Sequence, residues 1–120
     1  MFLNISNHKS QNWPEKEREA AMKWGYIKDL PFSPVRADAK KEEIQSMAEN
    51  LVREAVRLSP SVCLCQGEYS LTYHVVQGLK RYGIPVVCAC SERNTHETVL
   101  TETGTVQKKV VFNFVQFREY

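Results

Sequence analysis

Residues 62–73, VCLCQGEYSLTY, join the two kinds of structure that decide the fold. The first four residues are all apolar, which is typical of a strand buried on both faces in a parallel sheet. Gln66 and Gly67 end this run, and apolar residues then recur at helical spacing from Leu71 to Tyr82. The stretch therefore predicts a parallel α/β unit, with an amide, a glycine and an acid at the junction between strand and helix.

The same alternation extends in both directions from this junction. Apolar runs predict strands over residues 1–6, 26–32, 61–65 and 84–90. Helical spacing of apolar residues predicts helices over residues 14–24, 38–58 and 70–82. Strands that alternate with helices favour an α/β domain with a mainly parallel central sheet flanked by helices and joined by right-handed crossovers.

The C-terminal segment has a different pattern. Residues 94–120 carry β-branched and aromatic side chains on both sides of a Glu-Thr-Gly turn, which predicts a C-terminal β-hairpin. Val110, Phe112 and Phe114 make this hairpin too apolar for a free ribbon. We expect it to pack on the sheet edge or against a second subunit.

Length and composition limit the class of protein. A chain of 120 residues with 42% hydrophobic and 25% charged residues is typical of one soluble globular domain, here residues 1–120. The net charge of +2 gives no global field for duplex nucleic acid, so we expect any anion site to be local. No apolar run approaches a membrane span, and the first ten residues do not resemble a signal peptide. We therefore expect a cytoplasmic protein without membrane contact.

Four cysteines form two C-x-C pairs, Cys63 with Cys65 and Cys88 with Cys90, each inside an apolar run. Zinc ligands usually lie in turns with C-x2-C spacing, which these pairs lack. Reduced cysteines that pack as small hydrophobes are the favoured interpretation, and a metal site or a disulfide is the alternative.

Polar side chains gather where three of the predicted strands end. The sets are Ser6-Asn7-His8, Gln66-Gly67-Glu68 and Ser91-Glu92-Arg93, and the helix after the second set begins with Ser70 and Thr72. Ligands of parallel α/β sheets bind at the carboxyl ends of the strands. The three sets therefore predict one binding crevice, in which Gly67 admits a ligand close to the backbone and the helix amides face an anion.

Each of these residues also has a structural interpretation. Gly67 can serve a tight turn alone, His8 can be an exposed loop histidine, and Glu92 with Arg93 can be a weak surface ion pair. The sequence contains no dinucleotide-binding or P-loop motif, no nucleophile elbow and no carboxylate cluster for two-metal chemistry. We expect neither a metal nor another cofactor.

At the same positions the chain resembles the small stand-alone ring nucleases of type III CRISPR systems. The resemblance rests on SNH at 6–8, LCQGEYSLTY at 64–73, CACSER at 88–93 and FVQFREY at 114–120, in order along the chain. It implies a Rossmann-like fold related to the CRISPR-associated sensor domain. It also implies a homodimer that binds and cleaves cyclic oligoadenylate, commonly the tetra-adenylate, and so switches off an antiviral signal.

The implied reaction needs no metal, because a ribose 2′-hydroxyl attacks its adjacent phosphate. Under this resemblance the candidate catalytic residues are His8 as proton carrier, Arg93 as phosphate partner and Ser91. The candidate ligand-binding residues are Ser6, Asn7, Gln66, Gly67, Glu68, Ser70, Thr72 and Glu92. Two other functions stay open: a module that binds or sequesters a cyclic nucleotide without cleaving it, and an interaction protein that joins a complex through its hairpin.

Overall fold

The computed structural model describes residues 1–99 and 102–120. Its strands are β1 (Phe2–Ser6), β2 (Ile27–Asp29), β3 (Val62–Gln66), β4 (Val86–Val99) and β5 (Val106–Glu119). Its helices are α1 (Glu15–Met22), α2 (Lys41–Leu58) and α3 (Tyr69–Arg81), and a 3₁₀ turn, η1, covers Ser10–Asn12. Within the described residues, no helix has both the length and the apolar character that crossing a membrane requires.

The five strands form one sheet in the order β2-β1-β3-β4-β5. The first four strands are parallel, and β5 pairs antiparallel with β4 at the edge. This confirms the predicted α/β class, with a mainly parallel sheet and a C-terminal hairpin. Because β1, β3 and β4 are neighbours, the carboxyl ends of β1 and β3 and the middle of β4 meet at one side of the sheet.

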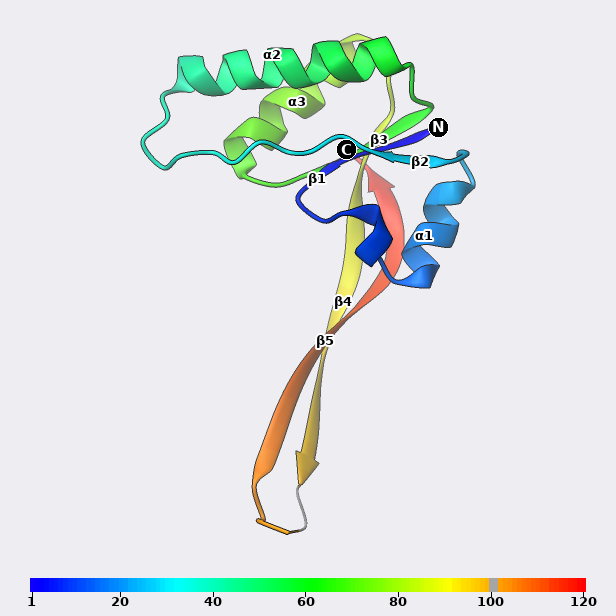
Figure 1. Ribbon diagram of the computed structural model, residues 1–120, viewed down its shortest axis with the longest axis vertical. Coiled ribbons are helices and arrows are strands. Elements are labelled where there is room, and N and C mark those ends of the chain that lie inside the picture. Colours follow the sequence, from blue (N-terminus) through cyan, green and yellow to red (C-terminus); the bar gives the residue numbers. More distant parts are fainter. Residues whose placement is uncertain (100–101) are drawn as a thin grey trace.

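Helices cover both faces of the sheet (Figure 1). On one face α2 and α3 pack together over the inward side chains of β1 and β3, which include Leu3, Ile5 and Cys65. On the other face Trp13 and Ala21 pack with Phe2, Leu64 and other residues in a smaller apolar cluster. The alternation of side chains along β1 and β3 explains why these strands are apolar throughout, since each face has its own cover.

The strand β4 is longer than the sequence predicts. The apolar pattern predicts a strand over residues 84–90 that ends in the set Ser91-Glu92-Arg93, but the strand continues to Val99 and pairs with β5 from Val87 onward. The register shifts between Cys90 and Ser91, since Cys90 pairs with Gln116 and Ser91 with Phe114. The strand pairs with β3 only as far as Val87, and the β-bulge follows shortly after that point, so Ser91 still lies near the edge where the prediction placed it.

Beyond the bulge β4 and β5 form a two-stranded ribbon that projects from the rest of the molecule (Figure 1). We call residues 91–99 and 106–115 the arm. The predicted hairpin, 94–120, consists of the second half of β4, β5 and the turn between them, and its residues 100–101 lie outside the described part of the chain. Several large apolar side chains of the arm are exposed: Val106, Val110, Phe112 and Val115. A two-stranded ribbon has no interior of its own, so these side chains have no core to enter.

Candidate functional site

A pocket of about 880 Å³ lies at the carboxyl ends of the strands, on the face that α1 covers. We call it the rim pocket. Its walls come from five parts of the chain: the end of β1 with the following loop and η1, the start of α1, β3, β4 and the arm. Five of the residues singled out in the sequence line it: Ser6, Asn7, His8, Gln66 and Ser91. The structure thus brings together one member or more of each predicted strand-end set.

The loop after β1 has a fixed backbone and free side chains. The buried Asn4 donates from Nδ2 to the carbonyl oxygen of His8 at 2.8 Å, and Trp13 Nε1 donates to the same oxygen at 3.1 Å. Ser6 Oγ donates to Asn4 Oδ1 at 2.7 Å and accepts from the His8 amide at 3.2 Å. The side chains of Asn7 and His8 are exposed at the pocket. The loop can therefore present an imidazole and an amide to a ligand from a rigid base.

Gln66 and Gly67 each have a structural partner. The Gln66 side chain bridges β3 to β4, since its Oε1 accepts from the Ala89 amide at 2.8 Å and its Nε2 donates to the Ala89 carbonyl at 3.4 Å. A Cβ on Gly67 would lie 2.5 Å from a ring carbon of the buried Phe32. The packing of Phe32 therefore explains the glycine, which does not line the rim pocket.

Glu68 occupies the position at which an anion was expected. Its carboxylate caps α3 and accepts from the amides of Ser70 at 3.0 Å and Leu71 at 2.8 Å. The hydroxyl of Ser70 donates to the same carboxylate at 2.7 Å. These hydrogen bonds, led by the one from the Ser70 hydroxyl, lower the pKa of Glu68. The amides of Ser70 and Leu71 thus have a hydrogen-bond acceptor within the chain itself. Glu68, Ser70 and Thr72 lie outside the rim pocket.

Side chains alternate between the two faces of β4, so the third strand-end set, Ser91-Glu92-Arg93, is divided between these faces. Ser91 pairs with Phe114 and lines the rim pocket beside Ala89. Arg93 follows two residues later on the same face, opposite Phe112, and is exposed just beyond the pocket wall. Glu92 lies on the opposite face. The geometry therefore keeps Ser91 and Arg93 on the side of the rim pocket and turns Glu92 away from it.

Sequence reasoning missed the aromatic and acidic parts of the pocket. Trp13, Phe112 and Phe114 line it, and Phe114 is 5% exposed with its ring centroid 4.8 Å from that of Phe117. Glu17, in the first turn of α1, also lines it, and little of this residue is exposed. The signal for Glu17 is its spacing, because it stands four residues after Trp13 and four before Ala21, on the apolar side of the segment.

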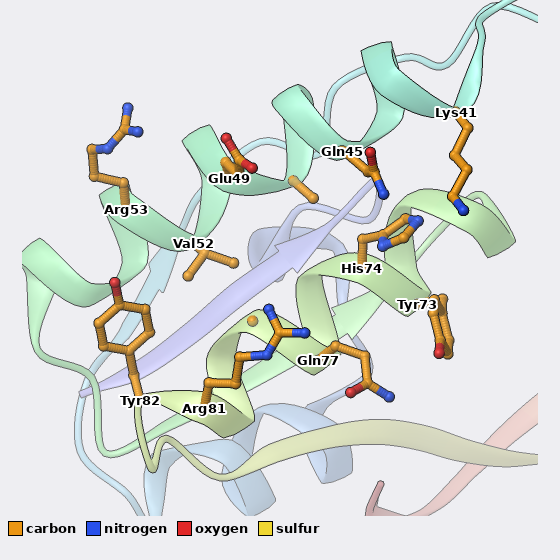
Figure 2. A pocket seen from close by; sticks show the side chains of 12 residues that line it. Lys41, Gln45, Glu49, Val52, Arg53, Tyr73, His74, Gln77, Arg81 and Tyr82 are labelled. Carbon is orange, nitrogen blue, oxygen red and sulfur yellow. The ribbon is translucent and has the colours of Figure 1, made fainter.

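A second cavity, of about 810 Å³, is a groove between α2 and α3 on the outer surface (Figure 2). Lys41, Gln45 and His74 lie together at one end, and Arg53 and Tyr82 at the other (Figure 2). Most of its lining side chains are exposed, and it lies on the helical layer away from the carboxyl ends of the strands. None of the residues predicted from the strand ends lines this groove.

The cysteines belong to the sheet and are all free thiols. Burial raises the pKa of Cys63 and of Cys65 to about 12, so both side chains are protonated at neutral pH. Cys88 and Cys90 are half-buried on the next strand. In residues 1–99 and 102–120, no group of three or more His, Cys, Asp or Glu side chains is arranged to hold a metal ion.

Comparison with known protein families gives a match over nearly the whole chain. The model of a family described as "Uncharacterized protein MJ1673 family" matches residues 1–118. No curated protein and no solved structure matches the chain.

Proposed function

The chain belongs to the MJ1673 family, a name that specifies no activity, and we propose from its rim pocket that the protein binds and cleaves cyclic oligoadenylate. One observation carries the proposal. The pocket combines aromatic walls with amide, hydroxyl, imidazole and ammonium groups at the carboxyl ends of parallel strands. Its volume of about 880 Å³ falls in the range of small-molecule sites. Rossmann-like folds also bind their ligands at the carboxyl ends of parallel strands, so the position of the pocket supports a Rossmann-like fold for this chain.

The aromatic wall suits an adenine base. Trp13 and Phe114 are buried in the pocket wall, whereas Phe112 is 65% exposed in the arm. Stacking on an aromatic side chain is worth about 1–3 kcal/mol per base. The side chains of Asn7 and Gln66 supply amide groups that can hydrogen-bond a base edge or a ribose.

The charged side chains near the pocket suit phosphate groups. His8 and Lys9 line the pocket, and Arg93 is exposed beyond Ser91 on the same strand face. In the described residues Arg93 forms no ion pair, so its planar guanidinium is available to phosphate oxygens. With a chain net charge of only +2, this local group of basic side chains is the feature that would attract an anion.

The reaction proposed is transfer of a phosphate from the 5′-oxygen to the 2′-oxygen. The 2′-hydroxyl loses its proton and attacks the adjacent phosphorus, and the bond from phosphorus to the 5′-oxygen breaks. The 5′-oxygen takes up a proton, which leaves a 2′,3′-cyclic phosphate and a 5′-hydroxyl. Because the substrate supplies the nucleophile, the protein needs only to align it, move protons and stabilise the phosphorane charge.

The arm and the proposed ligand both support a homodimer. Val106 and Val110 lie on the same arm face as Phe112 and Phe114, so an exposed stripe that is mostly apolar runs outward from the pocket. The ion pair between Lys108 and Glu97 interrupts this stripe between the two valines. A ring with two-fold symmetry fits two equivalent pockets related by a C2 axis. We therefore place a second copy of the chain against this stripe, where it would cover Val106 and Val110.

The test is incubation of the purified protein with cyclic tetra-adenylate in EDTA, with direct binding measured in parallel. We expect binding and linear products that end in a cyclic phosphate. Tight binding without products would favour the sequestering function. Activity that EDTA abolishes and manganese restores would refute the metal-independent reaction, and absence of binding would refute the proposed ligand.

A further inference from the structure

A glutamate that is mostly covered by its neighbours lies in the wall of the rim pocket. Glu17 lies in the first turn of α1, is 8% exposed and lines the pocket together with Trp13 and Leu64. Within residues 1–99 and 102–120 it has no salt-bridge partner. Partial desolvation of a carboxyl that has no charged partner costs stability, and a group perturbed in this way inside a pocket is a candidate for a functional role.

The local sequence explains why this carboxyl is free. Glu17 is the third residue of α1, and a glutamate at this position usually folds back to accept from the amide of the residue that caps the helix. Here the capping residue is Pro14, which has no amide hydrogen. The usual partner is missing, and the carboxyl is left beside the pocket instead of being used to close the helix end.

The surroundings of Glu17 favour proton uptake. Burial raises the pKa of Glu17 above the ordinary value for glutamate. The other titratable groups that line the pocket are His8 and Lys9, both from the loop after β1. The neighbouring strands contribute only uncharged residues to the lining: Leu64, Gln66, Ala89, Ser91, Phe112 and Phe114. On α1 itself the charged neighbours Glu15, Lys16 and Arg18 are exposed.

We propose that Glu17 is the general base of the rim pocket and accepts the proton of the attacking 2′-hydroxyl. This inference rests on the proposed ring cleavage. Two proton transfers are needed, one from the 2′-oxygen and one to the 5′-oxygen, and two proton carriers of different chemistry line the pocket. Glu17 takes the first proton as a carboxylate, and His8 gives the second as an imidazolium. The proton on Glu17 returns to solvent after the product leaves.

The test compares Glu17→Gln with Glu15→Gln, a change to an exposed acid in the same helical turn. Single-turnover cleavage of cyclic tetra-adenylate is measured from pH 4.5 to 9, and binding is measured for each protein. We expect Glu17→Gln to slow cleavage by about 100-fold or more while binding changes by less than about threefold. Wild-type cleavage should rise with pH as the carboxyl ionises, and Glu17→Gln should lose this acid limb. Glu15→Gln should match the wild type.

A second measurement does not depend on turnover. In protein labelled with ¹³C at the glutamate carboxyls, the Glu17 signal is identified by its loss in Glu17→Gln. We expect it to shift when the 2′-deoxy form of cyclic tetra-adenylate, which lacks the nucleophile, saturates the pocket. An unshifted signal at saturation would refute the contact.

Wild-type cleavage with an unchanged rate and pH profile in Glu17→Gln would refute the role of Glu17 and leave the proposed function intact. A wild-type protein that binds no ring and cleaves none would refute both proposals together.

Discussion

At the scale of single residues, the loop after β1 shows how a short polar segment becomes a site. The carbonyl oxygen of His8 accepts from Asn4 and Trp13, so the backbone is held while the imidazole stays exposed. His74 lies elsewhere, in the middle of α3, and lines the groove between α2 and α3, which we call the helix groove. The two histidines therefore form a matched pair for testing where proton transfer occurs.

We predict that His8→Ala slows cleavage of cyclic tetra-adenylate by about 100-fold or more, because one of the two proton carriers is lost. Binding should change little, since the backbone that shapes the pocket stays in place. Single-turnover kinetics and direct binding measure the two effects separately. His74→Ala is the control and should behave as the wild type. Wild-type cleavage in His8→Ala would exclude His8 as the acid.

For Arg93 the expected effect is on binding. Arg93→Ala should weaken binding of cyclic tetra-adenylate by about 1.5–3 kcal/mol, because a phosphate loses a charge-assisted hydrogen bond. Titration calorimetry measures this directly. Arg53→Ala, in the helix groove, removes an equal charge away from the rim pocket and should leave the affinity unchanged. Equal losses in both variants would indicate a nonspecific charge effect instead.

At the scale of elements, Glu68 serves as the N-cap of α3 and makes this helix sensitive to acid. We predict that Glu68→Ala lowers the free energy of unfolding by about 1 kcal/mol at pH 7, the usual cost of a lost cap. The pKa of Glu68 is lowered in the fold, so its contribution is present above about pH 4.5 and is lost as pH falls through the lower, folded value. The variant and the wild type should therefore converge at low pH.

Urea denaturation at pH 7 and pH 3, followed by circular dichroism, measures this convergence. Glu43→Ala is the control, because Glu43 lies in the first turn of α2, a helix whose start has no side-chain cap. A constant difference between wild type and Glu68→Ala at both pH values would show that the ionised carboxylate is not the cause.

The elements also show how far the sequence can be read. The prediction of β1, β3, α2 and α3 is confirmed because each carries its own apolar pattern, and Ile44, Ala48 and Leu51 are buried as the helical spacing requires. The extension of β4 could not be predicted, since Ser91 to Glu97 contains no large apolar residue. This part becomes a strand through pairing with the β-branched and aromatic residues of β5.

The candidate site, like the fold, could be predicted from the sequence only in part. The meeting of three strand ends was predictable from the parallel order of the strands, and it brings Ser6, His8 and Ser91 into one pocket. The fit of Phe32 against Gly67 was not predictable, because those two residues are 35 positions apart in the chain and meet only in the fold. Glu17 was missed because a glutamate in a first helical turn is ordinary until its burial is known.

At the scale of the whole molecule, the arm accounts for the elongated shape, with extents of 57 × 38 × 21 Å. We predict a dimer in sedimentation at micromolar concentration. Replacing Val106 and Val110 together with Lys should give a monomer, because the exposed apolar stripe would carry two buried charges in the interface. Both positions are exposed in the chain alone, so the fold should be retained.

Tyr82→Lys is the comparison, because Tyr82 is an exposed aromatic residue in the helix groove. A dimer that persists in the arm variant and is lost in Tyr82→Lys would move the interface to α2 and α3. A wild-type protein that is monomeric with and without cyclic tetra-adenylate would refute the dimer.

Because β4 and β5 pass from the sheet into the arm, the proposed ligand binding and the proposed assembly of two copies would involve the same two strands. Ser91, Phe112 and Phe114 belong both to the pocket wall and to the ribbon that a second copy would clasp. Such coupling is thermodynamically reciprocal, so any factor by which assembly raises ligand affinity is also the factor by which ligand favours assembly. If the arm assembles as proposed, apparent affinity rises with the amount of protein present. The abundance of the protein, and not only that of the messenger, then sets how strongly the signal is removed.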